Sequence, residues 1–130
     1  MRVRPVVLIV DDTLDQLDLY EMALSDRYTT VRATTGQGAI TSALAERPDV
    51  ILLDVMMPAD DGFATCARLK AHPVTQQIPV LLLTASDALD VEARAIRAGA
   101  TLLLHKPCAA ERLALTIDAV IDRSKQASAR

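Results

Sequence analysis

Five short segments that are poor in charge alternate along the chain with longer amphipathic segments. They cover residues 6–10, 29–33, 50–53, 78–83 and 101–104. Each is too short for a buried helix, and most are runs of Val, Ile and Leu, which is typical of parallel strands covered on both faces. The intervening segments are long enough for right-handed crossover connections. The pattern therefore predicts an α/β fold, with a five-stranded parallel sheet and helices on both faces.

Apolar residues at helical spacing follow each of these segments. The clearest stripe is Leu113, Ile117, Val120 and Ile121, and it predicts a final helix. The first helix is expected after Thr13, which together with Gln16 resembles a capping box. A weaker helix is expected over 87–98, and the residue before Pro73 should end the helix that follows Gly62. The stripe is lost after Asp122, so we expect one domain over 5–122, with 123–130 a frayed tail or the start of a linker.

Composition and charge exclude several classes of function. Of the 130 residues 51% are hydrophobic and only 2% aromatic, which suits one aliphatic core. A net charge of -3 gives no basic field for direct binding to nucleic acid. No apolar run could span a bilayer and no signal-peptide region is seen, so we expect no membrane association and a cytoplasmic location. Cys66 and Cys108 lack CxxC spacing and are expected as unbridged, buried apolar side chains.

Chemically active side chains stand where the predicted strands end. Asp11 and Asp12 follow the first strand, Asp54 the third, Thr84 the fourth and Lys106 the fifth. The carboxyl ends of parallel strands share one edge, so these groups should converge there. Three neighbouring carboxylates repel one another unless a cation joins them, and Mg²⁺ prefers such oxygen ligands. With Mg²⁺, Lys106 and Thr84 neutralising a phosphoryl group, Asp54 could act as a nucleophile and form an aspartyl phosphate.

The same residues carry a resemblance to a known family. Asp11-Asp12, Asp54 with Met57-Pro58, Asp61-Gly62, Thr84-Ala85, Ala98-Gly99-Ala100 and Lys106-Pro107 occur in this order. Together they resemble the receiver domain of bacterial two-component response regulators, of the CheY-like superfamily. The resemblance covers about residues 5–122 and implies a flavodoxin-like sheet in the order 2-1-3-4-5.

The resemblance also implies roles for individual residues. Asp54 would accept a phosphoryl group from a histidine kinase or a phosphotransfer protein. Asp12 would bind Mg²⁺ directly, Asp11 mainly through water, and the Met56 backbone carbonyl would complete the shell. Thr84 and Lys106 would hold the phosphoryl oxygens, and the Lys106-Pro107 peptide is often cis in such domains. The chain would be no enzyme beyond catalysing its own phosphorylation and dephosphorylation.

The partners implied are a downstream effector protein and a second copy. A homodimer would use the face formed by the fourth helix, the fifth strand and the last helix. Two residues near this face depart from the family pattern. Leu103 stands where an aromatic residue usually couples to Thr84, and Cys108 stands where Phe is common. The hypothesis is that the phosphorylation chemistry survives while the output face differs.

Other interpretations remain open at this stage. The chain could be a pseudo-receiver that binds its partners constitutively, which Leu103 favours. It could be a phosphatase acting on external substrates, although Met56 stands where a general acid would be needed. Asp11 and Asp12 could simply cap a helix, and Asp60 is expected to serve the loop. The segment 35–38 is only a fragment of a dinucleotide loop, and His72 and His105 are expected at the surface.

Overall fold

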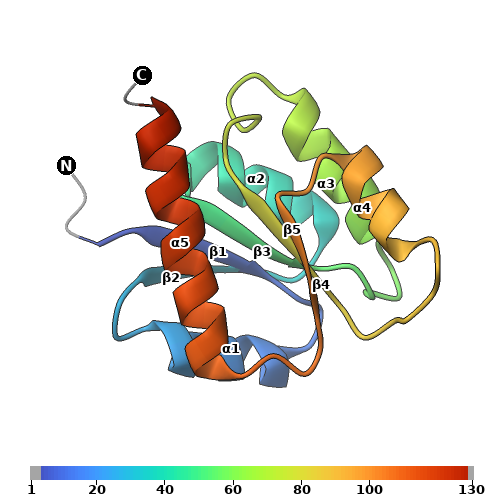
Figure 1. Cartoon of the computed structure of the whole chain (residues 1–130), viewed down its shortest axis with the longest axis horizontal. Helices are drawn as coiled ribbons and strands as arrows, with labels where there is room; N and C mark the ends of the chain where they lie inside the picture. Colours follow the sequence, from blue (N-terminus) through green and yellow to red (C-terminus); the bar gives the residue numbers. More distant parts are fainter. Residues whose placement is uncertain (1–3, 129–130) are drawn as a thin grey trace.

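The computed structural model describes residues 4–128. Five parallel strands alternate with five helices: β1 (Val6–Val10), α1 (Leu14–Leu24), β2 (Thr29–Ala33), α2 (Gly36–Glu46), β3 (Val50–Asp54), α3 (Gly62–Ala71), β4 (Val80–Thr84), α4 (Val91–Ala98), β5 (Leu102–His105) and α5 (Ala110–Ser128). The strands form one sheet in the order β2-β1-β3-β4-β5 (Figure 1). This is the flavodoxin-like order that was predicted.

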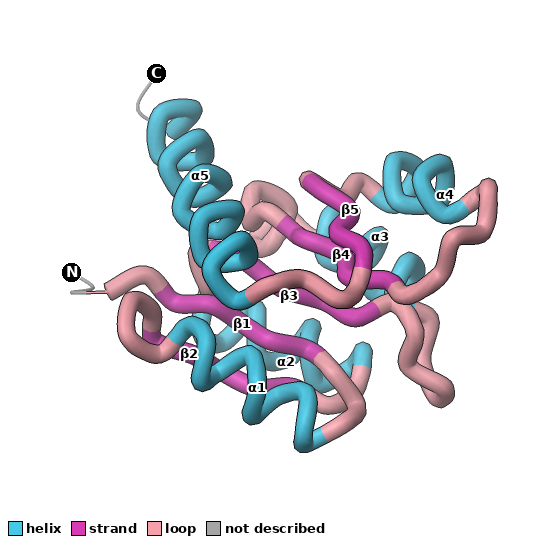
Figure 2. Tube along the Cα trace, turned by 60° about the horizontal axis from the view of Figure 1, so that its bottom comes forward, coloured by secondary structure: helices cyan, strands magenta, loops and turns pink. Residues whose placement is uncertain are grey.

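Two layers of helices cover the sheet, and each encloses its own apolar cluster. Helices α2, α3 and α4 pack on one face through residues such as Ile40, Leu69 and Ala95. Helices α1 and α5 cover the other face, where Leu17 and Ile117 are fully buried (Figure 2). Every residue of β3 and β4 is buried, since helices cover both sides of these central strands.

The register of the strands brings their carboxyl ends to one edge. Val10 of β1 lies beside Leu53, Asp54 lies beside Leu83, and Thr84 lies beside His105. The residues that follow these positions therefore start from neighbouring points. This edge carries every side chain for which the sequence predicts chemistry.

Some boundaries differ from the sequence prediction. Helix α4 begins at Val91, because the residues before it offer no apolar side chain to the core and Leu89 is fully exposed. Strands β4 and β5 begin later than expected and run through Thr84 and His105. At the C-terminal end, α5 continues to Ser128, so residues 123–128 are helical although the apolar stripe ends before them. Whether residues 123–130 form a tail or the start of a linker stays a prediction. In the described part of the chain, no helix is long and apolar enough to cross a membrane.

The predicted capping box is also corrected. Thr13 is the N-cap of α1, but its side chain makes no capping hydrogen bond. Its hydroxyl contacts Asp12 Oδ1 at 3.3 Å, and its N–H donates to Asp11 Oδ1 at 2.9 Å. The carboxylate of Asp11 thus accepts the N–H that a capping box would have paired with the side chain of Gln16.

Candidate functional site

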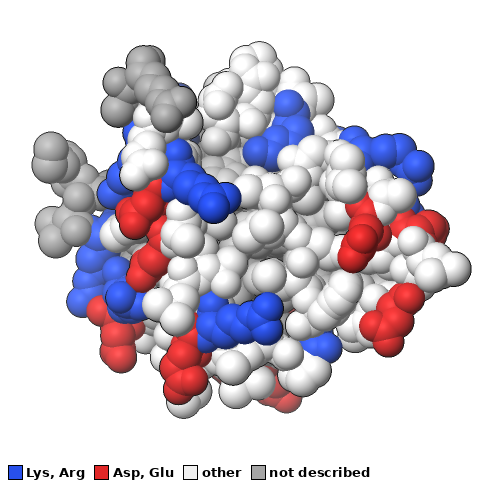
Figure 3. All heavy atoms as spheres, in the orientation of Figure 1, with Lys and Arg blue, Asp and Glu red and all other residues white. Residues whose placement is uncertain are grey.

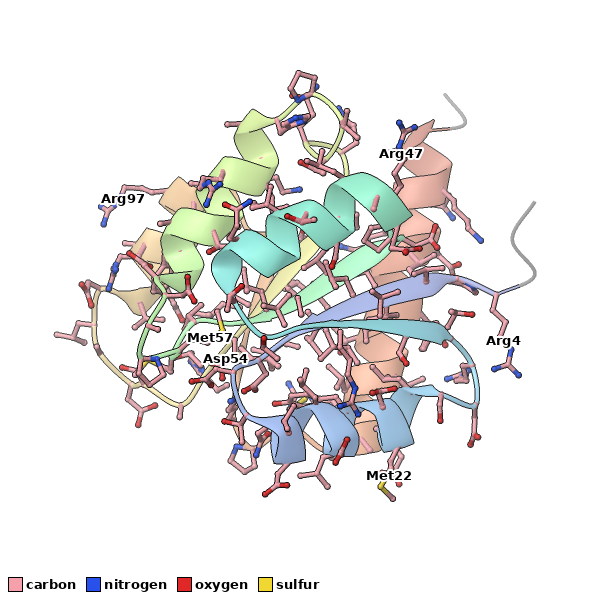
Figure 4. The ribbon with its side chains drawn as sticks, turned by 180° about the vertical axis from the view of Figure 1, so that it is seen from behind. Arg4, Met22, Arg47, Asp54, Met57 and Arg97 are labelled. Carbon is pink, nitrogen blue, oxygen red and sulfur yellow. The ribbon has the colours of Figure 1, made fainter. Side chains whose placement is uncertain are left out.

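Asp54 is the last residue of β3 and lies at the centre of the carboxyl-end edge. Its side chain is buried, and Oδ2 accepts a hydrogen bond from Lys106 Nζ at 3.0 Å. Oδ1 accepts the N–H of Met56 at 2.8 Å, so both oxygens are oriented by defined donors. Figure 4 shows Asp54 at this edge, next to Met57.

Two further carboxylates lie within reach of Asp54. Ligand oxygens of Asp11, Asp12 and Asp54 are all within 4.8 Å of one another. Asp11 and Asp54 are buried and Asp12 is exposed, so solvent reaches the cluster at Asp12. The first turn after β1 and the end of β3 bring these residues together, as the strand order requires.

Asp11 is held in an unfavourable charged state. Its Oδ2 is buried and, among the described residues, accepts no hydrogen bond, while Lys106 Nζ stands 3.9 Å away. Burial raises the pKa of Asp11 from 3.8 to about 6, and the charge of Asp54 adds to this, whereas the hydrogen bond from Thr13 opposes it. A buried carboxylate oxygen with no hydrogen-bond donor among the described residues is free to act as a metal ligand, so the donor set fits a hard divalent ion.

Lys106 and Thr84 complete the edge. Burial alone would lower the pKa of the Lys106 ammonium, but its hydrogen bond to Asp54 and the nearby negative charges outweigh burial and raise the pKa. Thr84 is buried, its Oγ1 accepts the N–H of Ser86 at 3.0 Å, and its carbonyl accepts the N–H of Lys106 at 2.8 Å. The Lys106-Pro107 peptide is cis. The end of β5 therefore places a cation on Asp54, and the end of the neighbouring strand β4 presents a hydroxyl at the same edge of the sheet.

The segment after Asp54 is tied to helices α3 and α4. Asp61 caps α3 by accepting the N–H groups of Phe63 and Ala64. The Arg94 guanidinium of α4 lies 4.3 Å from the centre of the Phe63 ring and 3.8 Å from Asp61 Oδ2. A Cβ at Gly62 would lie 2.5 Å from Val55 Cα, so this glycine permits the close approach of α3 to the Asp54 loop.

Tyr20 is a residue of this region that sequence reasoning missed as part of the site. It lines a hollow of about 520 Å³ between α1 and the loop after β5, together with Lys106, Pro107 and Cys108. Burial raises the pKa of the Tyr20 phenol, with the charges of Asp11 and Asp54 adding to this and that of Lys106 opposing it. The helical spacing places Tyr20 on the inner side of α1, but only the fold shows that Lys106 lies opposite.

Several other predicted positions lie outside the site. Thr35 caps α2 through Gly38 N–H, so the segment 35–38 is a helix start. His105 is exposed and His72 is half-buried, with Nδ1 accepting the N–H of Val74. Both cysteines are free as expected; Cys66 is buried, but Cys108 is only half-buried because it lies at the hollow beside α1. Met56 has an exposed side chain, and the role of its carbonyl stays a prediction.

A five-stranded parallel sheet with an acidic cluster and a lysine at its carboxyl-end edge defines a receiver-like signalling fold. The family described as the response regulator receiver domain matches residues 7–118. The chain belongs to this family. The match lies within the predicted domain 5–122, whose own boundaries stay a prediction.

Curated relatives carry the same domain within longer proteins. Response regulator PleD from Caulobacter vibrioides is 42% identical over 102 residues, which are 78% of this chain and 22% of PleD. Response regulator MprA from Mycobacterium ulcerans is 35% identical over 120 residues, which are 92% of this chain and 51% of MprA. The chain thus spans about a fifth to a half of the length of these relatives.

Solved structures share the architecture. Chemotaxis protein CheY4 of Vibrio cholerae has 30% sequence identity and a TM-score of 0.85, with 91% of this chain and 99% of that chain covered. A response regulator from Chloroflexus aurantiacus has 30% identity and a TM-score of 0.85, with 92% and 98% covered. The fold of a two-component signalling domain is therefore shown for this chain.

Proposed function

We propose that this domain is a phosphorylation-controlled switch that accepts a phosphoryl group on Asp54. The observation that supports it most directly is the position of Asp54, with one oxygen on Lys106 and two further carboxylates beside it. The buried carboxylates of Asp11 and Asp54 beside the Lys106 ammonium have no evident packing purpose, because burying these charges costs free energy. Binding of a cation and a phosphoryl group would compensate these charges and offset the free-energy cost of burying them.

The reaction would form a bond between Asp54 Oδ and phosphorus as the bond from phosphorus to the donor breaks. The donor would be a phosphohistidine of a histidine kinase or phosphotransfer protein, and the histidine would keep the electron pair. Lys106 and the Thr84 hydroxyl would hold the phosphoryl oxygens. Asp12, Asp11, Asp54 and the Met56 carbonyl would bind Mg²⁺, which would supply charge neutralisation for the transferring group.

The donor would reach Asp54 from the side of α1. The hollow between α1 and the loop after β5 opens next to Lys106, and Leu19 and Met22 expose apolar surface on the same helix. Figure 4 shows Met22 pointing outward from α1. A cytoplasmic kinase or phosphotransfer protein would dock here, while an effector or a second copy would use the face formed by α4, β5 and α5.

Intact-mass measurement tests the proposal. The chain is incubated with acetyl phosphate and Mg²⁺, with and without a chelator, beside Asp54→Asn and Asp60→Asn as a matched control. We expect one phosphoryl adduct on the wild type and on Asp60→Asn, and none on Asp54→Asn or with the chelator. An adduct that persists in Asp54→Asn would exclude Asp54 as the acceptor.

A constitutive interaction module is the second candidate, and Leu103 favours it. Leu103 is partly buried against the cluster that α4 packs on, and a leucine has no aromatic ring to rotate as Thr84 moves. Amide chemical shifts with and without beryllofluoride, a phosphoryl mimic, separate the two candidates. Shifts that change at Asp54 but stay unchanged over residues 87–120 would support the constitutive module.

A further inference from the structure

Helix α4 contributes small side chains to the core of the molecule. Of its buried residues, Ala95 and Ala98 belong to the apolar cluster on that face of the sheet. Alanine buries little apolar area, so these two residues do little to hold the helix in place. Residues 85–90, before α4, form a loop in which Leu89 is fully exposed. The position of α4 therefore depends largely on its contacts with α3, the helix beside it (Figures 1 and 2).

The two ends of α4 contact α3 in different ways. Near the C-terminal end, the buried Cys66 thiol donates a hydrogen bond to the Ala98 carbonyl at 3.4 Å. Gly99, directly after the helix, lies against the side chain of Lys70. In the first turn the contact is made by Arg94, whose side chain is 42% exposed. The C-terminal end is thus held by buried groups, whereas the first turn is held by a side chain that solvent reaches.

Arg94 makes two contacts at once because its guanidinium group is planar. The group lies 4.3 Å from the centre of the Phe63 ring and 3.8 Å from Asp61 Oδ2. A lysine ammonium could not stack on a ring and face a carboxylate in the same way. Ion pairs between half-exposed groups contribute little free energy, so these contacts can break and re-form more easily than buried ones.

Arg94 is held by its particular neighbours and not by a general attraction of charges. Helix α4 carries Glu92 and Arg97 besides Arg94. Figure 3 shows both acidic and basic side chains on the side of the molecule where α4 lies, so neither charge dominates there. In Figure 4 Arg97 points away from the ribbon. Arg97 therefore offers an arginine on the same helix that lacks the contacts of Arg94.

The neighbours of Arg94 belong to the segment that follows Asp54. Asp61 caps α3, and a Cβ at Gly62 would lie 2.9 Å from the Asp54 carbonyl oxygen, so the two backbones touch. Met56, which stands between them, donates its N–H to Asp54 Oδ1 at 2.8 Å. An uninterrupted series of contacts thus leads from the Asp54 side chain to α4. The series does not include β5, where Leu103 has no ring that could rotate.

We propose that Arg94 is a positioning residue that makes the placement of α4 depend on the occupancy of the Asp54 site. Phosphorylation turns the Asp54 carboxylate into a neutral acyl group and so weakens its charge-assisted hydrogen bond from Met56. The segment up to Asp61 and Phe63 then adjusts, and Arg94 moves with it. The first turn of α4 follows, while its C-terminal end stays in place. The inference rests on the proposed function and adds to it a path through α3.

Amide hydrogen exchange of the full chain tests the proposal, measured in Mg²⁺ with and without beryllofluoride. The ratio of the two exchange rates over Val91–Ala98 is compared between variants, so that a general loosening of α4 cancels. We expect beryllofluoride to change the rates by about threefold or more in the wild type and in Arg97→Gln, the matched control. In Arg94→Gln this change should be lost, while the amide chemical shifts of Asp54 and Met56 still respond.

Phe63→Leu is the second variant, because it removes the ring and keeps an apolar side chain toward the core. It should lose the response of α4 as Arg94→Gln does, and circular dichroism checks that each variant is folded. A response that persists in either variant, or that is lost equally in Arg97→Gln, would overturn the proposal. An unresponsive α4 in a wild type whose Asp54 amide shifts would also overturn it. No response at Asp54 itself, with no phosphoryl adduct, would contradict the proposed function and the inference with it.

Discussion

At the scale of single residues, Asp11 shows how an acidic site opposes folding. Its carboxyl is buried, with one oxygen that accepts no hydrogen bond from the described residues, and its pKa is raised to about 6. Between the ordinary value of 3.8 and about 6, the folded chain holds a proton that the unfolded chain releases. Asp11 therefore favours folding at low pH, and this contribution is lost as the pH rises through about 6.

This predicts that Asp11→Asn stabilises the chain at neutral pH when no divalent ion is present. The rise in pKa corresponds to about 3 kcal/mol, and screening at this open edge reduces the expected gain to about 1–2 kcal/mol. Near pH 4 the gain should largely vanish, because both side chains are then neutral. Urea unfolding at the two pH values measures it, with the exposed Asp12→Asn as control. A loss of stability in Asp11→Asn at neutral pH would contradict the prediction.

The sequence could place Asp11, Asp12, Asp54, Thr84 and Lys106 at one edge because each follows a predicted strand. It could not show that Tyr20 lies near Lys106. The spacing of apolar residues indicates which face of a helix is buried, but it does not indicate which residues of other elements pack against that face. The sequence also assigned the start of α1 to a Thr13 capping box. In the structure the buried Asp11 carboxylate accepts the Thr13 N–H. The sequence left a helix-start role open for Asp11 and Asp12 but could not decide between it and the capping box.

At the scale of secondary-structure elements, the junction of β3 and α3 sets the shape of the site. Gly62 lets α3 begin directly against the backbone of Asp54 and Val55. Asp61 fixes the first turn, and Arg94 connects it to α4. The segment after Asp54 is therefore in contact with both helices.

Gly62→Ala should destabilise the chain and disturb Asp54. The added Cβ would lie 2.5 Å from Val55 Cα and 2.9 Å from the Asp54 carbonyl oxygen, so the backbone must move. We expect a loss of about 1–3 kcal/mol, as for other overpacked sites, together with slower phosphorylation by acetyl phosphate. Gly38→Ala in α2 is the control, since outside its own helix the added Cβ would meet only side chains, Thr35 Oγ1 at 3.0 Å and Ala33 Cβ at 3.7 Å. Equal losses in the two variants would contradict this account.

The sequence predicted the boundaries of helices and strands correctly where a run or a regular spacing of apolar residues marked them. The four apolar residues that predicted α5 are all buried in the structure. The last turns of the helix carry no such apolar residues, so the sequence did not predict that α5 extends to Ser128. Helix α4 was expected too early because Asp87 and Ala88 are compatible with a helix. Local propensity does not reveal that the core begins only at Val91.

At the scale of the whole molecule, the free energy of the site is coupled to the stability of the fold. Three carboxylates at the ends of β1 and β3 repel one another across the centre of the sheet. An ion that binds only the folded chain relieves this repulsion and stabilises every strand at once. Site occupancy should therefore be visible in global unfolding.

We expect Mg²⁺ to raise the melting temperature at neutral pH. At a concentration tenfold above its dissociation constant, a ligand of the folded state adds about 1.4 kcal/mol. For a chain of this size this corresponds to a rise of about 4–6 °C. Scanning calorimetry with ionic strength matched by NaCl measures it, and Asp54→Asn should reduce the rise. An identical rise in NaCl alone would mean that the site does not bind the ion.

The length of α5 has a consequence for reporters attached to this domain. The last fully or nearly fully buried residue of α5 is Ile121, and the helix continues to Ser128 (Figure 1). If a fluorescent protein were joined after Ser128 so that the helix continued into it, the connection would be a rigid helix instead of a flexible linker. Each residue inserted at the joint would turn the reporter by about 100° and advance it by about 1.5 Å. A short series of such insertions would convert small rotations of α5 into periodic changes in energy transfer.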